Sequence, residues 1–210
     1  MRGEITILKS HIALIDHGVG NLRSVEKALA AVGANVSLTR DPDVIVSADK
    51  LVLPGVGAFG DCMNGLRESG TLELVRSLAV ERPFLGICVG MQMLFETSDE
   101  MGNHRGLGLL PGFVTRFKDS DIRVPHTGWN QLDIAIEHPL LEGIHTGSYA
   151  YFNHSYFCTP TNLKDVLSYT EYGAKFCSII ARDRLYGIQC HPEKSQDIGL
   201  QILRNFVEKG

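Results

Sequence analysis

The sequence predicts an α/β protein with an open, mostly parallel sheet, helices on both faces, and a strand-rich second half. Short apolar runs alternate with helical patterns over the first hundred residues, which is typical of parallel strand–helix–strand units. The second half has many strand-like segments and few helical patterns. Because 210 residues, 44% of them hydrophobic, can bury a full core and no linker interrupts them, we expect a single domain over residues 1–210.

The first strand and helix are predicted over residues 11–16 and 21–33. HIALID is short and mostly apolar, and glycines follow it closely, as expected of a buried parallel strand. In the next segment Asn21 can cap a helix and Gly33 stands at a C-cap position. Apolar residues recur at helical spacing between them: Leu22, Val25, Leu29 and Val32.

The rest of the first half repeats this order. Strands are predicted over 34–39, 50–55 and 83–88, a turn at Asp41-Pro42, helical segments around 61–80, and a helix over 89–97. Ligands of such sheets bind beyond the carboxyl ends of the strands. Three loops leave those ends, DHGVGN, PGVGAFG and CVGMQ, so the candidate chemistry gathers along one edge.

Strand-like segments fill the second half: GLLPGFVTRF, WNQLDIAI, SYAYFNHSYF, DVLSYTEY, FCSIIARD and RLYGIQCH, the last expected to end at His191. The final helix is predicted over 195–208. Its apolar stripe consists of Ile198, Ile202, Phe206, Leu203 and Val207.

Composition excludes several classes of protein. The formal net charge is -4 and no long basic run occurs, so nucleic acid is not an expected partner. No apolar stretch approaches the ~18 residues that span a membrane, and the start is not a signal peptide. Five cysteines without a CxxC pair argue against a disulfide framework and a metal site, and favour a reducing cytoplasm. A dinucleotide site is rejected because Arg23 stands where the third glycine of the fingerprint belongs.

Cys88 ends the strand predicted over 83–88, in the motif G-I-C-V-G. This motif has the form of a nucleophile elbow, in which small residues, here Gly86 and Gly90, let a sharp turn close between strand and helix. The geometry would expose the Cys88 side chain, aim the amide of Val89 at the reaction centre, and favour a thiolate. The alternative is an ordinary buried cysteine, the usual state of this residue.

A candidate base lies about a hundred residues later, in QCHPEKS. His191 and Glu193 are two residues apart, so they project to the same side of an extended chain, and Pro192 stiffens the link. A carboxylate beside an imidazole sets its tautomer and steadies its cation, as in a catalytic triad. Cys190 faces the opposite way and is expected in the core. The alternative is a helix-capping role for Glu193, with His191 merely exposed.

These motifs, G-x-C-x-G-x-Q at 86–92 and H-P-E at 191–193, resemble the class I (triad) glutamine amidotransferases. The resemblance narrows to the glutaminase subunits of imidazole glycerol phosphate synthases, which belong to histidine biosynthesis, and it covers nearly the whole chain. The segments that carry it are IDHGVGNLRSV, LPGVGAFGDCM, GICVGMQMLF, VPHTGWN, YFNHSY and QCHPEKS. Two departures are His17, where the family usually has tyrosine, and an N-terminal extension over residues 1–8.

The resemblance implies a glutaminase mechanism without a cofactor. Cys88 attacks the side-chain amide carbon of L-glutamine, His191 carries the thiol proton to the departing ammonia, and Glu193 orients His191. Water then cleaves the thioester. Backbone amides of Val89 and of the loop at Val56 and Gly57 would hold the oxyanion, and the amino-acid end of glutamine would lie against Gly57, Gln92, His154, Ser155 and Tyr156. These residues have structural alternatives: Gly57 as a turn residue, Gln92 as a helix cap and Tyr156 as a packed ring.

Free ammonia protonates in neutral water, so a useful glutaminase passes it directly to an acceptor site. No acceptor domain is recognisable in this chain, and the resemblance implies a (β/α)₈-barrel cyclase subunit in a heterodimer. It places Asn21, Trp129 and Lys194 at the interface. The alternatives are core packing for Trp129 and a solvated charge for Lys194. We expect the partner to control activity.

Three rival functions stay open at this point. A paralogous glutaminase subunit could supply ammonia for amidation of a surface sugar. A thiol hydrolase or peptidase could use the same α/β scaffold, but it would not need Gln92 or the PGVG and NHSY segments. A catalytically silent subunit could only stabilise a partner, but it would not need an intact Cys88, His191 and Glu193.

Overall fold

The computed structural model describes residues 10–18, 22–118 and 121–210 of the chain. The expected extension over residues 1–8, and Asn21 with its predicted capping role, lie outside these residues.

Strands and helices alternate in the first half, as predicted. The elements are β1 (His11–Ile15), α1 (Leu22–Ala31), β2 (Asn35–Thr39), α2 (Pro42–Ser47), β3 (Lys50–Gly55), α3 (Phe59–Glu68), α4 (Leu72–Glu81), β4 (Phe84–Cys88) and the short α5 (Val89–Gln92).

Strands dominate the second half, up to the final helix. They are β5 (Phe95–Ser98), β6 (His104–Arg105), β7 (Leu110–Arg116), β8 (His126–Gln131), β9 (Asp133–Ile134), β10 (Tyr149–His154), β11 (Tyr156–Pro160), β12 (Val166–Tyr172), β13 (Ala174–Arg182) and β14 (Leu185–Ile188). The helices are α6 (Gln196–Lys209) and the 3₁₀ turns η1 (Pro139–Leu141), η2 (Leu163–Asp165) and η3 (Pro192–Lys194).

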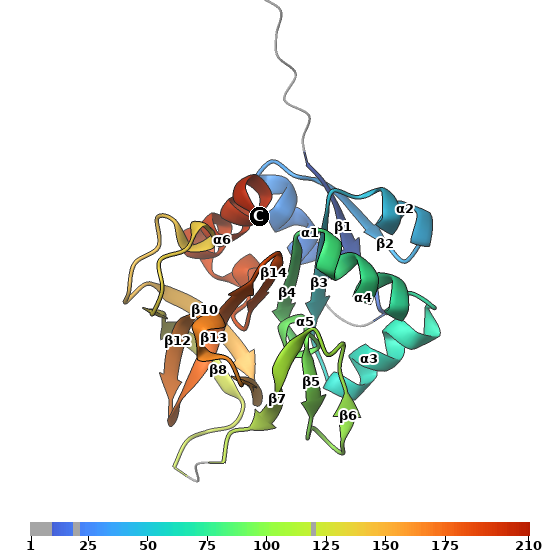
Figure 1. Cartoon of the computed structure of the whole chain (residues 1–210). Helices are drawn as coiled ribbons and strands as arrows, with labels where there is room; N and C mark the ends of the chain where they lie inside the picture. Colours follow the sequence, from blue (N-terminus) through green and yellow to red (C-terminus); the bar gives the residue numbers. More distant parts are fainter. Residues whose placement is uncertain (1–9, 19–21, 119–120) are drawn as a thin grey trace, which may run out of the picture.

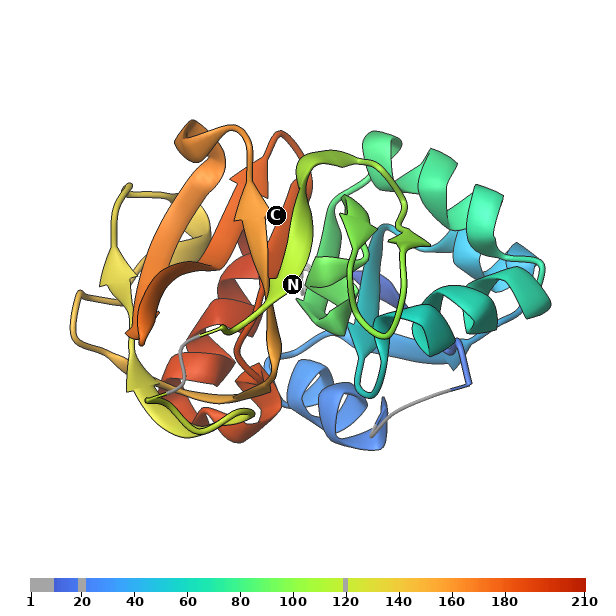
Figure 2. The same ribbon diagram turned by 90° about the horizontal axis from the view of Figure 1, so that it is seen from below.

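The central sheet has eight strands in the order β2-β1-β3-β4-β14-β13-β12-β9. The strands from β2 to β14 run parallel, and those from β14 to β9 run antiparallel. Helices α1 and α6 lie on one side of the parallel part, and α3 and α4 lie on the other (Figures 1 and 2). This arrangement confirms the predicted fold class. Two smaller sheets, β11-β7-β5-β6 and β10-β8, stand beyond the carboxyl end of β4.

The core forms between the central sheet and its helices. Every residue of β3 and β4 is buried, because a parallel strand covered on both faces meets apolar neighbours on each side. The stripe of α6 faces this core, with Ile202, Leu203 and Phe206 fully buried. No helix in the described part of the chain has the length and apolar character needed to cross a membrane.

The helix predicted over 89–97 is wrong beyond Gln92. Phe95–Ser98 form strand β5, which pairs in parallel with β7. The carbonyls of Met93, Leu94 and Glu96 accept hydrogen bonds from amides of residues 106–110, so distant backbone takes the place of further helical turns. An apolar run of this length is compatible with either a strand or a helix, and pairing with distant strands selects the strand here.

Two smaller predictions also need correction. Asp41-Pro42 does not form a simple turn: the Asp41 side chain accepts from the amide of Asp43 at 3.0 Å and Pro42 begins helix α2, a common N-cap arrangement. The strand expected to end at His191 ends at Ile188. The amide of His191 donates to the Tyr151 carbonyl of β10 at 2.8 Å, so the chain has already left the central sheet there.

Candidate active site

Cys88 sits in a strained turn between β4 and α5. Its φ is 54° and its ψ is -111°, a conformation that non-glycine residues rarely adopt and that costs on the order of 1–3 kcal/mol. The flanking glycines are needed for close backbone approach. A Cβ on Gly86 would lie 2.5 Å from the Gly90 carbonyl oxygen, and one on Gly90 would lie 1.8 Å from the Leu53 carbonyl oxygen.

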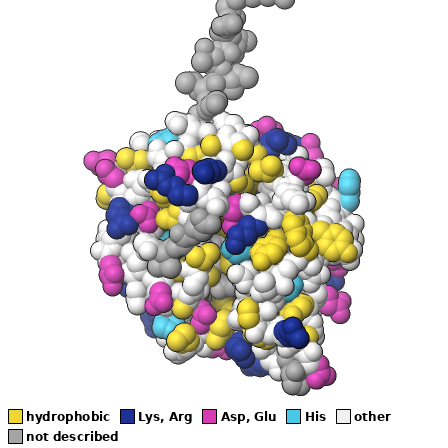
Figure 3. Space-filling model, turned by 180° about the vertical axis from the view of Figure 1, so that it is seen from behind, with side chains coloured by type: hydrophobic (Ala, Val, Ile, Leu, Met, Phe, Trp, Pro, Cys, Tyr) yellow, Lys and Arg dark blue, Asp and Glu magenta, His cyan; other side chains and the backbone are white. Residues whose placement is uncertain are grey.

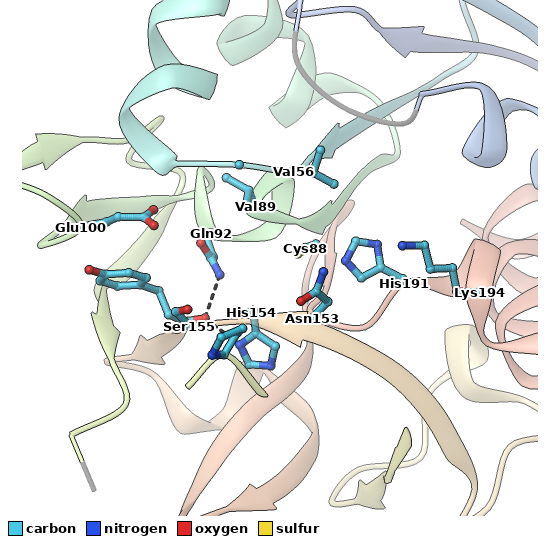
Figure 4. Close-up of a pocket in the computed structure, with 13 residues that line it drawn as sticks. Val56, Cys88, Val89, Gln92, Glu100, Asn153, His154, Ser155, His191 and Lys194 are labelled. Atoms are coloured by element: carbon cyan, nitrogen blue, oxygen red, sulfur yellow. Dashed lines mark hydrogen bonds between the residues drawn. The ribbon is translucent and has the colours of Figure 1, made fainter. Parts of the chain in front are cut away.

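The side chain of Cys88 lies inside a cavity rather than on the surface. The residue is only 2% exposed, so the expectation of an exposed side chain is wrong. The cavity measures about 260 Å³ and is enclosed by strands of the small sheets as well as by the elbow. Its lining residues are Val56, Gly57, Cys88, Val89, Gln92, Glu100, Pro125, Asn153, His154, Ser155, Tyr156, His191 and Lys194 (Figure 4).

His191 and Glu193 form a buried pair beside Cys88. The distance from His191 Nδ1 to Glu193 Oε1 is 2.9 Å, and each side chain is 4% exposed, so the alternative of an exposed, capping pair is wrong. The pair arises in the 3₁₀ turn η3, not in an extended chain as the spacing argument assumed. With Nδ1 turned to the carboxylate, Nε2 is the nitrogen left for Cys88.

The charge state of His191 follows from these neighbours. Burial by itself lowers the pKa of the imidazole, but the hydrogen bonds and charges of Cys88 and Glu193 outweigh it and raise the pKa to about 10. A proton taken from the thiol therefore rests stably on the imidazole, where it can pass to a leaving group.

The proposed oxyanion donors line the same cavity as Cys88. Gly57 has a φ of 98°, in the left-handed region that favours glycine. The carbonyl of Val56 accepts from Cys62 Sγ at 3.6 Å. Because C=O and N–H of a trans peptide point in opposite directions, this contact turns the Gly57 amide away from Cys62. Val89 follows the elbow at the start of α5 and lies above Cys88 in Figure 4.

The expected substrate residues all line the cavity, and all but Gly57 come from α5 and from the segment that joins β10 to β11. Gln92 is 2% exposed, and its Nε2 donates to the Tyr156 carbonyl at 2.9 Å and to Gln189 Oε1 at 3.1 Å. His154 Nδ1 lies 2.8 Å from the same carbonyl. Gln92 and His154 therefore fix the backbone of Tyr156 while they line the cavity. Ser155 lines the cavity as well.

Glu100 and Asn153 line the cavity although sequence reasoning missed them. The Glu100 carboxylate accepts from the amide of Phe59 at 2.7 Å, and burial raises the pKa of the group against the effect of that bond. In Figure 4 it lies at the opposite end of the cavity from His191. The acidic pair Asp99-Glu100 was visible in the sequence, but the wrongly extended helix gave no reason to bring it back to Cys88.

Lys194 lines the cavity, and Trp129 and Lys194 both contact the ring of Tyr151. Trp129 is 46% exposed, so its alternative as a core residue is wrong, and its ring meets that of Tyr151 edge-on at 6.1 Å. Lys194 Nζ lies 5.6 Å from the centre of the same ring. Figure 3 shows one face of the molecule on which hydrophobic side chains gather beside basic ones.

The described residues contain no group of three or more ligating side chains that could hold a metal ion. All five cysteines are buried and unpaired, and Cys190 is fully in the core, as expected.

The family model for class I glutamine amidotransferases matches residues 13–209. A curated relative from Syntrophotalea carbinolica, "Imidazole glycerol phosphate synthase subunit HisH", is 48% identical over 202 residues, which cover 93% of this chain and 98% of that protein. The protein of the same name from Salinibacter ruber is 49% identical over 202 residues, covering 92% of each chain. The chain belongs to the HisH family of class I glutamine amidotransferases. The family that the motifs predicted is thus confirmed.

Solved structures agree with the fold of this HisH-family chain. The structure titled "Structure of PurLQS from Thermotoga maritima" has a TM-score of 0.74 at 16% identity and covers 95% of this chain and 98% of its own. One titled "Crystal structure of glutamine amidotransferase" has a TM-score of 0.71 at 20% identity and covers 90% and 94%. At these identities the likeness concerns the fold alone.

Two buried histidines of this HisH-family chain predict a pH dependence of its stability. Burial lowers the pKa of His126 to about 4 and that of His154 to about 3, from an ordinary value of 6.5. As the pH falls from about 6.5 towards 4, the unfolded chain binds protons at these two positions and the folded chain does not. The contribution of the two histidines to stability is therefore complete above about 6.5 and declines below it. His191, whose pKa is raised, is protonated in both states in this window.

We therefore expect the urea midpoint to fall steadily between pH 7 and pH 4.5. Chemical denaturation at pH 7, 6, 5 and 4.5 measures it. The urea midpoint of a His126→Phe variant should decline less steeply, because its unfolded chain no longer binds a proton at position 126. Parallel declines in the two proteins would contradict the assignment.

Proposed function

We propose that the chain hydrolyses L-glutamine to glutamate and ammonia through a thioester on Cys88, and delivers the ammonia to a separate cyclase subunit of imidazole glycerol phosphate synthase in histidine biosynthesis. One observation carries the proposal: a strained Cys88 lines one cavity with His191, whose imidazole is paired with the buried Glu193, in a chain of the HisH family. This function is favoured over the sugar-amidation alternative by relatives that are named as subunits of this synthase.

The reaction follows from the groups around Cys88. Its sulfur attacks the amide carbon of glutamine while His191 takes the thiol proton, and Glu193 holds the imidazole with Nε2 towards the sulfur. Amides of Val89 and of the Val56–Gly57 loop donate hydrogen bonds to the oxyanion, a contribution of roughly 2.7–4 kcal/mol for one donor in comparable sites. His191 then protonates the leaving nitrogen, and water cleaves the thioester with the same imidazole as base.

We place the substrate along the line from Cys88 to Glu100. With the reacting amide at Cys88, the amino-acid end extends past Gln92 towards Glu100 (Figure 4). Glu100 is an acidic group on that wall, and an α-ammonium is its natural partner. The amides and hydroxyl of the Gly57, Ser155 and Tyr156 segments remain for the α-carboxylate.

Replacement of Glu100 by glutamine is expected to raise KM for glutamine about 10- to 100-fold with kcat changed less than about threefold, because a charged hydrogen bond contributes roughly 1.5–3 kcal/mol. The substituted amide oxygen can still accept from the Phe59 amide, so the fold is preserved. Steady-state glutamate release measures the effect. Asp99→Asn, beside it in sequence, is the matched control and should leave KM unchanged.

A partner chain is proposed because ammonia must be used before it protonates. We propose a (β/α)₈-barrel cyclase as that partner, docking where Trp129 and Lys194 approach the cavity through Tyr151. Asn21 is proposed for the same interface on the resemblance alone. Five unpaired cysteines support the cytoplasm as the compartment. Neither nucleic acid nor membrane has a part in this proposal.

The experiment is glutamate release from glutamine by the purified chain alone, with the barrel cyclase, and with cyclase plus its acceptor nucleotide. We expect strong stimulation by the complete mixture. Activity that is indifferent to the cyclase would move the protein to another acceptor pathway, such as sugar amidation. Absence of glutamate release in every mixture would overturn the proposal and favour a catalytically inactive subunit or a protein of another function.

A further inference from the structure

The motif VPHTGWN contains His126, whose purpose the proposed mechanism does not explain. The residue begins β8 opposite His154 of β10 and is 3% exposed. Its ring stacks against Tyr172 at 4.0 Å and Phe152 at 5.0 Å between ring centres. The stacked rings hold the plane of the imidazole, and within that plane its nitrogens face His154 and Asn130.

The hydrogen bonds around His126 determine where its proton lies. His154 Nδ1 faces the Tyr156 carbonyl at 2.8 Å, and a carbonyl only accepts, so this nitrogen carries the hydrogen. Burial keeps His154 neutral, which leaves its Nε2 without a hydrogen. That nitrogen lies 3.2 Å from His126 Nδ1, which must therefore be the donor.

The far side of His126 completes the same pattern. Its Nε2, now without a hydrogen, lies 3.2 Å from the side-chain amide nitrogen of Asn130, which donates to it. The second hydrogen of that amide goes to the Glu171 carbonyl at 2.9 Å. In the hydrogen-bonded row Asn130–His126–His154, every donor faces one acceptor. Only one arrangement of protons therefore satisfies all of these hydrogen bonds.

The row ends at the glutamine cavity. The Tyr156 carbonyl that His154 holds is also held by Gln92, and all three residues line the cavity. If His154 lost its donor, it could take the other tautomer. Its bare Nδ1 would then face the lone pairs of the Tyr156 carbonyl, and the segment from His154 to Tyr156 would have to shift.

We propose that His126 is a positioning residue of the glutamine site: by donating from its Nδ1 to His154 Nε2, it stabilises the His154 tautomer that holds the Tyr156 backbone. The inference rests on the proposed glutaminase function, since it assigns that cavity to glutamine. It gives His126 a role inside the chain, separate from that of the exposed Trp129 in the same PHxGWN motif.

Two variants with opposite defects test this role. His126→Phe keeps a ring in the aromatic stack but removes the donor, so the fold should stay stable while KM for glutamine rises about 5- to 30-fold, as for one lost buried hydrogen bond. His126→Asn places an amide nitrogen near the former Nδ1 but leaves a gap in the stack. It should be less stable than the phenylalanine variant and yet have a KM closer to that of the unmodified chain.

The control is Tyr172→Phe, which keeps the stacked ring and removes only the bond from its hydroxyl to the Arg123 carbonyl. Its KM should be unchanged. A merely structural role would make KM follow stability, with the asparagine variant worst in both, and that ranking would overturn the proposal. Kinetics are measured with the cyclase present, and stability by urea denaturation.

Nitrogen-15 NMR of the imidazoles reads the tautomers directly and does not depend on turnover. We expect His126 and His154 of the unmodified chain each to be protonated at Nδ1 and bare at Nε2, and His154 of the phenylalanine variant to populate both tautomers. An Nε2–H form of either histidine in the unmodified chain would overturn the inference. Absence of any glutaminase activity would instead remove the proposed function and leave the tautomer result standing as a fact about the fold.

Discussion

Replacement of Cys88 by alanine is expected to lower glutamate release by at least about 10³-fold, because no other group in the cavity can form the thioester. The change removes one sulfur from a small buried side chain. The free energy of unfolding should therefore change by no more than about 1 kcal/mol. Steady-state assays with the cyclase present, together with urea denaturation, measure the two effects.

Cys190→Ala is the matched control for this variant. Cys190 is as buried as Cys88 and adjoins His191. Burial is the main cause that raises the pKa of its thiol to about 12, so it forms no nucleophilic thiolate near neutral pH. It should keep its activity. Near-normal turnover by the Cys88→Ala protein would remove the cysteine from the mechanism.

Replacement of Glu193 by glutamine is expected to lower kcat about 10²- to 10⁴-fold with little change in KM, since loss of the carboxylate partner of a catalytic imidazole has effects of that size. The amide is nearly the same shape, so the pocket stays closed. It does not carry the charge that steadies the imidazolium, and the pKa of His191, held near 10 partly by Glu193, should fall.

The pH profile of kcat separates this role from a packing defect. In the Glu193→Gln enzyme the limb assigned to His191 should move to lower pH, whereas a loosely packed site would lose activity without moving it. The exposed Glu208 of α6 supplies the control, and Glu208→Gln should match the unmodified chain in rate and profile. An unshifted limb would count against the triad assignment of Glu193.

The parallel half of the fold could be predicted from sequence because its strands are continuous apolar runs. The sequence predicts KLVLPG residue for residue, since β3 is buried on both faces and ends on Gly55. The first helix was predicted because a one-sided stripe and Gly33 mark it locally.

Features set by distant partners were not predictable in this way. β5 takes its partners from the later strands β6 and β7, so the apolar run after Gln92 favours a helix when the sequence is considered alone, and Glu100 is missed with it. The His191–Glu193 pair was found by spacing, although a 3₁₀ turn and not an extended strand creates it. The row from Asn130 to His154 depends on the register of β8 against β10, which one sequence does not contain.

The most direct test of the mechanism is to label the chain with a glutamine analogue whose side-chain amide is replaced by an electrophilic ketone, and to locate the adduct by peptide mass spectrometry. The structure offers five cysteines, all buried, of which only Cys88 lines the cavity. We predict one equivalent of label on Cys88, none on Cys62, Cys158, Cys177 or Cys190, and protection by L-glutamine. Label on another cysteine, or an unlabelled Cys88 in a preparation that still releases glutamate, would contradict the account.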